Sequence, residues 1–209
     1  MIRLAPEGRP FVLGAFVILA VLCVAKLFVL ASLWLPIAVW TIVFFRDPVR
    51  TGPRGGDLII SPADGKVVDI REVDESQFIG GRAMRVCIFM NVFDCHVNRY
   101  PIDGTVAYRH YTPGKFLNAA DERASLQNEQ SSVGLVTRHG KVLLRQIAGL
   151  IARRIITDHA VDTVVHQGDR LGMIRFGSRV DLYLPLDATI TVKLGDRPRA
   201  GETVVARWN

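Results

Sequence analysis

The run Arg85-Val86-Cys87-Ile88-Phe89-Met90 decides how most of this 209-residue chain folds. It is short and rich in β-branched and aromatic residues, which is typical of a buried strand. Similar runs bounded by turn-forming residues occur along the chain from Asp57 onward, at 58–60, 66–70, 104–108, 132–137, 141–145, 180–185 and 188–194. Helical signal is weak there and is confined to 118–128 and 148–154. The sequence therefore predicts a mainly β domain over residues 57–209.

A different pattern precedes this domain. Residues 11–45 are almost wholly apolar and are interrupted only by Lys26 and Pro36. One helix needs about 20 apolar residues to span a bilayer, so this stretch is too long for one simple span and short for two. We predict two tight helices, 11–25 and 27–45, that meet near Lys26 and form an N-terminal membrane-anchoring hairpin. Whether the hairpin spans the membrane or re-enters it stays open.

Basic residues flank the apolar stretch on both sides, with Arg3 and Arg9 before it and Arg46, Arg50 and Arg54 after it. Basic flanks stay on the cytoplasmic side, which predicts the cytoplasmic face of the cell membrane for both ends. A cleaved signal peptide is disfavoured because no small-residue cleavage site ends the first apolar run. A buried helical pair in a soluble protein is the other alternative. The Pro- and Gly-rich residues that follow predict a linker, so that anchor and linker occupy residues 1–56.

The composition restricts the partners. The net charge of +6 and the pI of about 9.6 indicate an anionic partner, either a nucleic acid or a membrane surface. No basic run is interleaved with aromatic residues, and the apolar N-terminus favours the membrane over nucleic acid. The cysteines Cys23, Cys87 and Cys95 show no zinc-site spacing, and we expect no metal. Cys95, next to His96, is either a nucleophile or a small core residue.

A turn motif occurs twice. The sequence Pro62-Ala63-Asp64-Gly65-Lys66-Val67 recurs as Pro101-Ile102-Asp103-Gly104-Thr105-Val106. Proline followed by Asp-Gly is a tight turn that feeds a strand. The repetition indicates either two similar turns or two related β-hairpin units that pack together.

Four motifs together resemble the phosphatidylserine decarboxylases of the short, pyruvoyl-dependent type. They are Ser61-Pro62-Ala63-Asp64-Gly65, Phe93-Asp94-Cys95-His96-Val97-Asn98-Arg99, Gly114-Lys115-Phe116-Leu117-Asn118-Ala119 with Asn128-Glu129, and Gly177-Ser178. The resemblance runs from about residue 44 to residue 192. It implies a barrel-sandwich-hybrid-like β core and an enzyme that converts phosphatidylserine to phosphatidylethanolamine and CO₂. It also implies self-cleavage between Gly177 and Ser178, with Ser178 becoming a pyruvoyl cofactor that forms a Schiff base with the substrate.

The chemistry explains the Gly-Ser pair. Decarboxylation next to an amine needs an electron sink, and a pyruvoyl ketone is one. The resemblance implies that the Ser178 hydroxyl attacks the Gly177 carbonyl and forms an ester. Elimination is then expected to leave dehydroalanine, which hydrolyses to pyruvoyl. Glycine tolerates the strained backbone that this attack requires. We therefore expect a large chain, 1–177, and a small chain, 178–209, held as a heterodimer, with a higher homo-oligomer left open.

The resemblance also supplies the catalytic candidates. Asp64 matches the family's triad aspartate, and His96 falls in its histidine motif. In a Ser-His-Asp arrangement the histidine takes the serine proton and the carboxylate orients the histidine. Longer family members carry HxxH in this motif, whereas Arg99 stands at the second place here. Either His96 serves both in processing and in decarboxylation, or another histidine takes one of these roles.

Arg99, Lys115 and Phe116 are further candidates for substrate binding. Arg99 either pairs with the lipid's phosphate or carboxylate, or forms a surface ion pair with Asp94 or Asp103. Lys115 lies in a loop that could close over the head group, and Phe116 contacts acyl chains or is ordinary core. The alternative function for the whole chain is a non-catalytic, membrane-anchored β domain that binds anionic lipid or a protein partner.

Overall fold

The computed structural model describes residues 2–119, 124–149, 154–175 and 177–208. The chain divides into two compact units, Met1–Val49 and Arg50–Asn209. Each unit has its own secondary structure and is described by itself.

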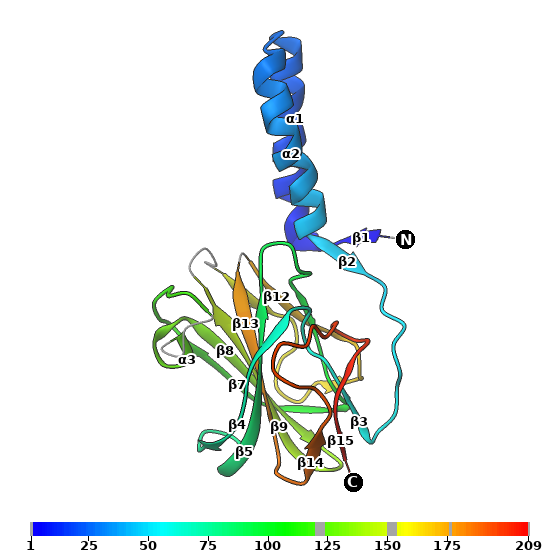
Figure 1. Cartoon of the computed structure of the whole chain (residues 1–209), viewed down its shortest axis with the longest axis vertical. Coiled ribbons are helices and arrows are strands. Elements are labelled where there is room, and N and C mark those ends of the chain that lie inside the picture. Colours follow the sequence, from blue (N-terminus) through cyan, green and yellow to red (C-terminus); the bar gives the residue numbers. More distant parts are fainter. Residues whose placement is uncertain (1, 120–123, 150–153, 176, 209) are drawn as a thin grey trace. The chain divides into compact units, whose positions relative to one another are not determined.

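The first unit is a helical hairpin. Helices α1 (Arg9–Val24) and α2 (Phe28–Phe44) lie side by side (Figure 1), and a 3₁₀ turn, Pro6–Gly8, precedes α1. Strands β1 (Ile2–Leu4) and β2 (Arg46–Pro48) pair antiparallel at the base. The indole Nε1 of Trp34 donates to the Ala15 carbonyl oxygen at 2.8 Å, which joins the two helices. Lys26, with φ of +59°, lies in the turn between them, as predicted.

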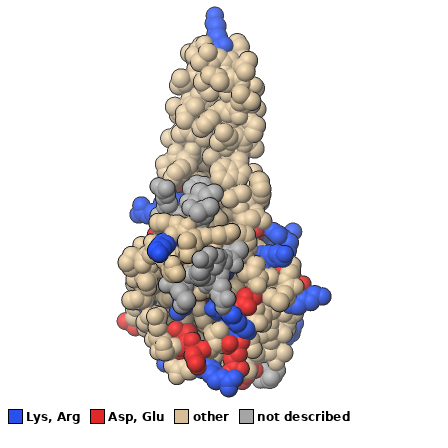
Figure 2. Space-filling view, turned by 60° about the vertical axis from the view of Figure 1, so that its left-hand side comes forward, with Lys and Arg blue, Asp and Glu red and all other residues tan. Residues whose placement is uncertain are grey.

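The hairpin exposes a continuous apolar surface. Val24, Val29 and Leu33 are 84%, 74% and 67% exposed, and the hairpin in Figure 2 is almost free of charged side chains below its tip. Surfaces of this kind mark contact with a membrane or with another protein. Within the described residues, one helix, Pro6–Val24, is long and apolar enough to cross a membrane by length and composition. Phe28–Phe44 is apolar but shorter. The N-terminal helix thus indicates membrane association.

The second unit is built on a seven-stranded antiparallel sheet in the order β11-β7-β8-β9-β13-β5-β4 (Figure 1). Its strands are β4 (Lys66–Glu75), β5 (Gly81–Met90), β7 (Gly104–Thr112), β8 (Gln130–Thr137), β9 (Gly140–Ala148), β11 (Val164–Val165) and β13 (Ser178–Leu184). The opening run, 85–90, is the second half of β5. It pairs with β13 on one side and with β4 on the other.

Two three-stranded sheets complete this unit, together with the short helix α3 (Ala124–Gln127). One sheet has the order β10 (Ile155–Thr157), β12 (Arg170–Ile174), β6 (Val97–Arg99), and the other β14 (Ala188–Ile190), β15 (Val204–Trp208), β3 (Leu58–Ile60). The main hydrophobic core takes buried side chains from all three sheets, including Ile88, Leu182, Leu171 and Val205. The predicted mainly β class with an N-terminal helical hairpin is confirmed.

Some predicted elements differ from those observed. The predicted strand 188–194 ends at Ile190, where β14 stops pairing with β15. The helix predicted over 148–154 does not begin at Ala148, which is the last residue of β9. Its central residues, 150–153, lie outside the described part, as do 120–123 within the segment 118–128, of which α3 is the helical part.

The repeated turn motif feeds two strands with the same irregularity. β4 shifts register between Val67 and Asp69, and β7 shifts between Val106 and Tyr108. A Cβ atom at Gly65 or at Gly104 would lie 2.2 Å or 2.8 Å from a neighbouring carbonyl oxygen. Both copies therefore bring a glycine close to another strand and then bulge at the same offset. This favours two related β units over two turns that resemble each other by chance.

Candidate active site

Ser178 is the first residue of β13 and lies between two neighbouring strands. In the sheet register it is opposite Ala148 of β9 and Met90 of β5. Its side chain is on the same face as Val180 and Leu182 of the core, because alternate residues of a strand share a face. Ser178 is fully buried, and its Oγ makes no hydrogen bond within the described part of the chain. A buried hydroxyl without a partner is rare and costly, which singles this group out as chemically available.

Gly177 has a backbone conformation that favours glycine. Its φ is +63°, in the left-handed region that other residues enter at a cost. A Cβ at this position would meet no atom within 4 Å, so conformation and not space calls for glycine. The peptide bond between Gly177 and Ser178 therefore joins a left-handed residue to the start of a buried strand.

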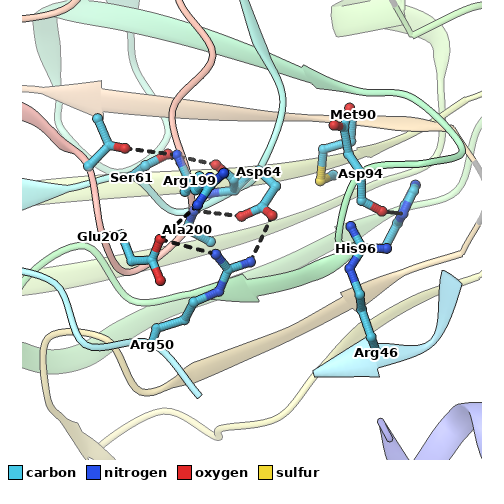
Figure 3. A network of polar contacts seen from close by, with 12 residues as sticks. Arg46, Arg50, Ser61, Asp64, Met90, Asp94, His96, Arg199, Ala200 and Glu202 are labelled. Atoms are coloured by element: carbon cyan, nitrogen blue, oxygen red, sulfur yellow. Dashed lines mark hydrogen bonds and ion pairs between the residues drawn. The ribbon is translucent and has the colours of Figure 1, made fainter. Parts of the chain in front are cut away.

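His96 lies directly before β6 and is fully buried. Its Nε2 accepts a hydrogen bond from the Gly177 N–H at 3.3 Å. Its Nδ1 lies 3.0 Å from the carbonyl oxygen of Asp94, and both residues are labelled in Figure 3. A carbonyl oxygen can only accept, so Nδ1 carries the proton and Nε2 keeps its lone pair. These partners assign a neutral imidazole whose unprotonated nitrogen faces the residue before Ser178.

Asp64 lies near the His96 motif but binds other groups. The Arg99 N–H donates to the Pro62 carbonyl at 2.9 Å, which joins the turn containing Asp64 to β6. The Asp64 carboxylate pairs with Arg50 at 2.7 Å and accepts from the Ala200 N–H at 2.7 Å (Figure 3). Burial lowers the pKa of Arg50, and the Asp64 carboxylate raises it, with a net upward shift.

This arrangement differs from the expected triad. The groups that bind the Asp64 carboxylate in the described part are Arg50 and Ala200, and the Asp94 carbonyl occupies the orienting position at His96 Nδ1. The sequence reasoning missed the Asp94 carbonyl because a backbone oxygen carries no side-chain signal. A direct role of Asp64 in orienting His96 stays a prediction.

Arg99 ends β6, and its guanidinium donates to the Gly168 carbonyl oxygen at 3.0 Å. The carboxylates considered as its surface partners bind other groups. Asp94 pairs with Arg197 at 2.7 Å, and Asp103 accepts from a backbone N–H at 2.6 Å. Arg99 is thus held by the backbone of the segment before β12.

The loop that contains Lys115 and Phe116 presents one polar and one apolar side chain. Lys115 is exposed, with its Nζ 3.3 Å from the Gln127 amide oxygen. Phe116 is half-buried and packs against the main core. This favours the core interpretation for Phe116 and leaves Lys115 as the group of the pair that faces solvent.

Asn128 ties this loop to the end of β9. It is 1% exposed, accepts from the Leu117 N–H at 2.9 Å, and donates to the carbonyl oxygens of Leu117 and Ala148 at 2.8 and 2.7 Å. Ala148 is the register partner of Ser178. The loop is therefore connected through one buried amide to the strand beside the Gly177–Ser178 bond.

Arg179 and Asp181 were missed by the sequence reasoning. They alternate with core residues and form a buried ion pair on the other face of β13, with Nε–Oδ1 and Nη2–Oδ2 distances of 2.7 and 3.0 Å. Arg179 also donates to the Ala119 carbonyl at 2.9 Å and to the Ser125 hydroxyl. The alternation of charged and apolar residues in 178–184 was the available signal. This pair fixes the strand that begins at Ser178.

The two cysteines of this unit are both buried. Cys95 is 1% exposed, which agrees with the interpretation as a small core residue. Burial also raises the pKa of the Cys87 thiol. A protonated, inaccessible thiol is a poor nucleophile.

In this mainly β unit, the Ser178 hydroxyl makes no hydrogen bond to the described residues, and a neutral histidine nitrogen binds the N–H of the preceding glycine. This is the arrangement expected of a self-processing enzyme precursor. Comparison with known proteins shows which family of this class the chain belongs to. The model of the phosphatidylserine decarboxylase family matches residues 37–206. The chain belongs to the phosphatidylserine decarboxylase family.

Three relatives match along nearly their whole length, and each is named phosphatidylserine decarboxylase proenzyme. The protein of Symbiobacterium thermophilum is 49% identical over 98% of this chain and 95% of its own. Those of Desulfotalea psychrophila and Geotalea uraniireducens are 44% and 43% identical, over 99% and 97% of this chain and 97% and 95% of their own. Membership makes this chain an enzyme of the carboxy-lyase class and does not favour the non-catalytic alternative.

Proposed function

We propose that this chain is a membrane-anchored phosphatidylserine decarboxylase that cuts itself between Gly177 and Ser178. One observation carries the cleavage site: the buried Ser178 hydroxyl has no hydrogen-bond partner among the described residues, and the N–H of the preceding residue, Gly177, binds the lone pair of His96 Nε2. The names of the three relatives, all proenzymes, support a chain that is processed before it acts. Residues 1–56 are the anchor and linker, and residues 57–209 are the catalytic domain.

Self-cleavage begins with an acyl shift. Ser178 Oγ attacks the Gly177 carbonyl carbon, and its proton passes to His96 Nε2, which gives up its hydrogen bond to the Gly177 N–H. The C–N bond then breaks, and the Ser178 nitrogen leaves with a proton from the imidazolium. An ester now joins Gly177 to the Ser178 oxygen. The left-handed Gly177 allows the peptide to bend toward the hydroxyl.

Elimination completes the cut. A base removes the Ser178 Cα proton, the Cβ–Oγ bond breaks, and Gly177 leaves with a carboxylate. The dehydroalanine at position 178 takes up one water and releases ammonia, which leaves a pyruvoyl group. The chains 1–177 and 178–209 stay together because β13 remains hydrogen-bonded between β5 and β9.

The residues present fit this group, because position 178 is buried beside a neutral imidazole at a strand end. A pyruvoyl group there supplies a ketone that condenses with a primary amine and accepts the electrons left by departing CO₂. His96 is placed to return a proton to the product. The exposed Lys115 and the net charge of +6 favour an anionic phospholipid.

The anchor determines which substrate the enzyme meets. Helices of 16 and 17 residues are about 24–26 Å long, a little shorter than the hydrocarbon thickness of about 30 Å. Lys26 in the turn can extend its ammonium toward the far head groups. Arg3, Arg9 and Arg46 flank the hairpin and keep its base on the cytoplasmic face. A membrane-held enzyme meets phosphatidylserine, whereas a soluble amino-acid decarboxylase needs no anchor.

Intact-mass measurement of the purified protein tests the proposal. We expect two chains that meet at Gly177 and residue 178, and release of CO₂ and phosphatidylethanolamine from labelled phosphatidylserine. S178A should stay uncut and inactive, and S76A, a change at an exposed serine, should behave like wild type. A single uncut species with full activity would refute the cleavage. A matured protein that releases no CO₂ from phosphatidylserine would refute the substrate.

A further inference from the structure

Gly149, which follows β9, occupies a place where no side chain fits. A Cβ atom there would lie 2.0 Å from the Gly177 carbonyl oxygen and 2.9 Å from its carbonyl carbon. Side-chain Cβ atoms essentially never approach other atoms below 3.0 Å, and the atoms met here are backbone. The carbonyl group that Ser178 attacks therefore fills the space that any side chain at position 149 would take.

The requirement for glycine at this position comes from space and not from conformation. The φ of Gly149 is not in the left-handed region, whereas that of Gly177 is +63° with open space around it. The two glycines thus meet at one carbonyl group for opposite reasons. Gly177 lets the peptide bend, and Gly149 leaves room for the carbonyl oxygen that the bend turns toward it.

The backbone beside Gly149 is fixed. The Ala148 N–H donates to the Glu129 carbonyl at 2.9 Å, and the Ala148 carbonyl accepts from buried Asn128 at 2.7 Å. Ala148 is also the register partner of Ser178. Because these bonds hold the residue directly before Gly149 through both its N–H and its carbonyl, a side chain at 149 would displace the Gly177 carbonyl more readily than its own backbone.

We propose that Gly149 is a positioning residue for self-cleavage. Its bare Cα forms the wall against which the scissile carbonyl rests, within reach of the Ser178 hydroxyl. The inference rests on the proposed cleavage between Gly177 and Ser178. A misplacement of reacting atoms by about 1 Å costs on the order of 100-fold in rate, and a methyl group at 149 enforces a shift of this size.

The test is the rate of self-cleavage of the full-length G149A chain, followed on denaturing gels from the time of synthesis. We expect cleavage to slow by about 100-fold or more. G81A is the matched control, because a Cβ at Gly81, the first residue of β5, meets nothing within 4 Å and should leave the rate unchanged. Thermal unfolding of G149A,S178A against S178A, both uncut, shows whether the fold persists.

A second variant distinguishes displacement of the Gly177 carbonyl from a clash with the neighbouring Ala119 side chain. The Gly149 Cβ would also lie 3.2 Å from the Ala119 Cβ, and A119G,G149A removes that contact alone. A folded double variant that stays uncut supports the inference. Recovery of cleavage in it, or wild-type cleavage in G149A, overturns the inference, and so does failure of both variants to fold. Wild-type protein cut elsewhere or uncut would instead remove the proposed function.

Discussion

Replacement of His96 by glutamine should nearly abolish self-cleavage while the fold persists. The amide side chain introduced in H96Q can still accept from the Gly177 N–H, but it cannot take the Ser178 proton. Loss of a general base costs about 10²–10⁴ in rate, or about 3–5 kcal/mol in activation free energy. The hydrogen bond from Nδ1 to the Asp94 carbonyl is worth about 1 kcal/mol, so stability should change little.

The assay is a time course of the protein made by cell-free translation and pulse-labelled. The uncut and cut chains are quantified on a denaturing gel. H110Q is the control, because His110 is exposed on β7. Added imidazole should restore part of the rate to H96A, where the truncated side chain leaves room for it. Cleavage of H96Q at a rate near that of wild type would refute the base assignment. A slow H96A chain that imidazole does not accelerate would point to a structural role.

Three further predictions concern the surroundings of this site. D64N should slow cleavage less than H96Q does, because the Asp64 carboxylate binds Arg50 and Ala200; an equal loss in the same time course would contradict this. R179M should lower the free energy of unfolding of the uncut S178A chain by about 3–5 kcal/mol, because Asp181 is left buried and unpaired. Denaturant titration measures this, and a negligible change would exclude it. Removal of residues 1–45 should release a more soluble protein that still cleaves itself, and its retention in the membrane fraction would count against the anchor.

The elements predicted from sequence are those with a long, consistent pattern. The hairpin is predictable from sequence because its two apolar segments are long and Lys26 separates them where the chain turns. Strands β5 and β13 are predictable from sequence because each has several β-branched or apolar residues in succession. β6 and β11 have three and two residues, too few to show a period. They exist because β12 and β7 offer them hydrogen-bond partners far along the chain.

The same limit applies to the candidate site. Resemblance directed attention to Ser178, Gly177 and His96, and the structure brings these three residues together. It could not place the Asp64 carboxylate, because the partners that bind it, Arg50 and Ala200, are set by the fold and not by a local motif. A charged arginine and a backbone N–H satisfy a carboxylate better than a neutral imidazole does. The aspartate therefore binds them, and the Nδ1 of His96 binds the Asp94 carbonyl oxygen.

Gly149 shows why a site can depend on a residue that no local pattern reveals. Gly177 is recognisable beside its serine, and its conformation explains its identity without reference to any other segment. Gly149 follows an ordinary strand, and its identity is set by an atom of Gly177 that reaches it only when β9 and β13 pair. Spatial requirements of this kind arise from pairing, so they become visible only once the register is known. In the proposed cleavage, both glycines contribute: Gly177 bends the peptide, and Gly149 leaves room for its carbonyl oxygen.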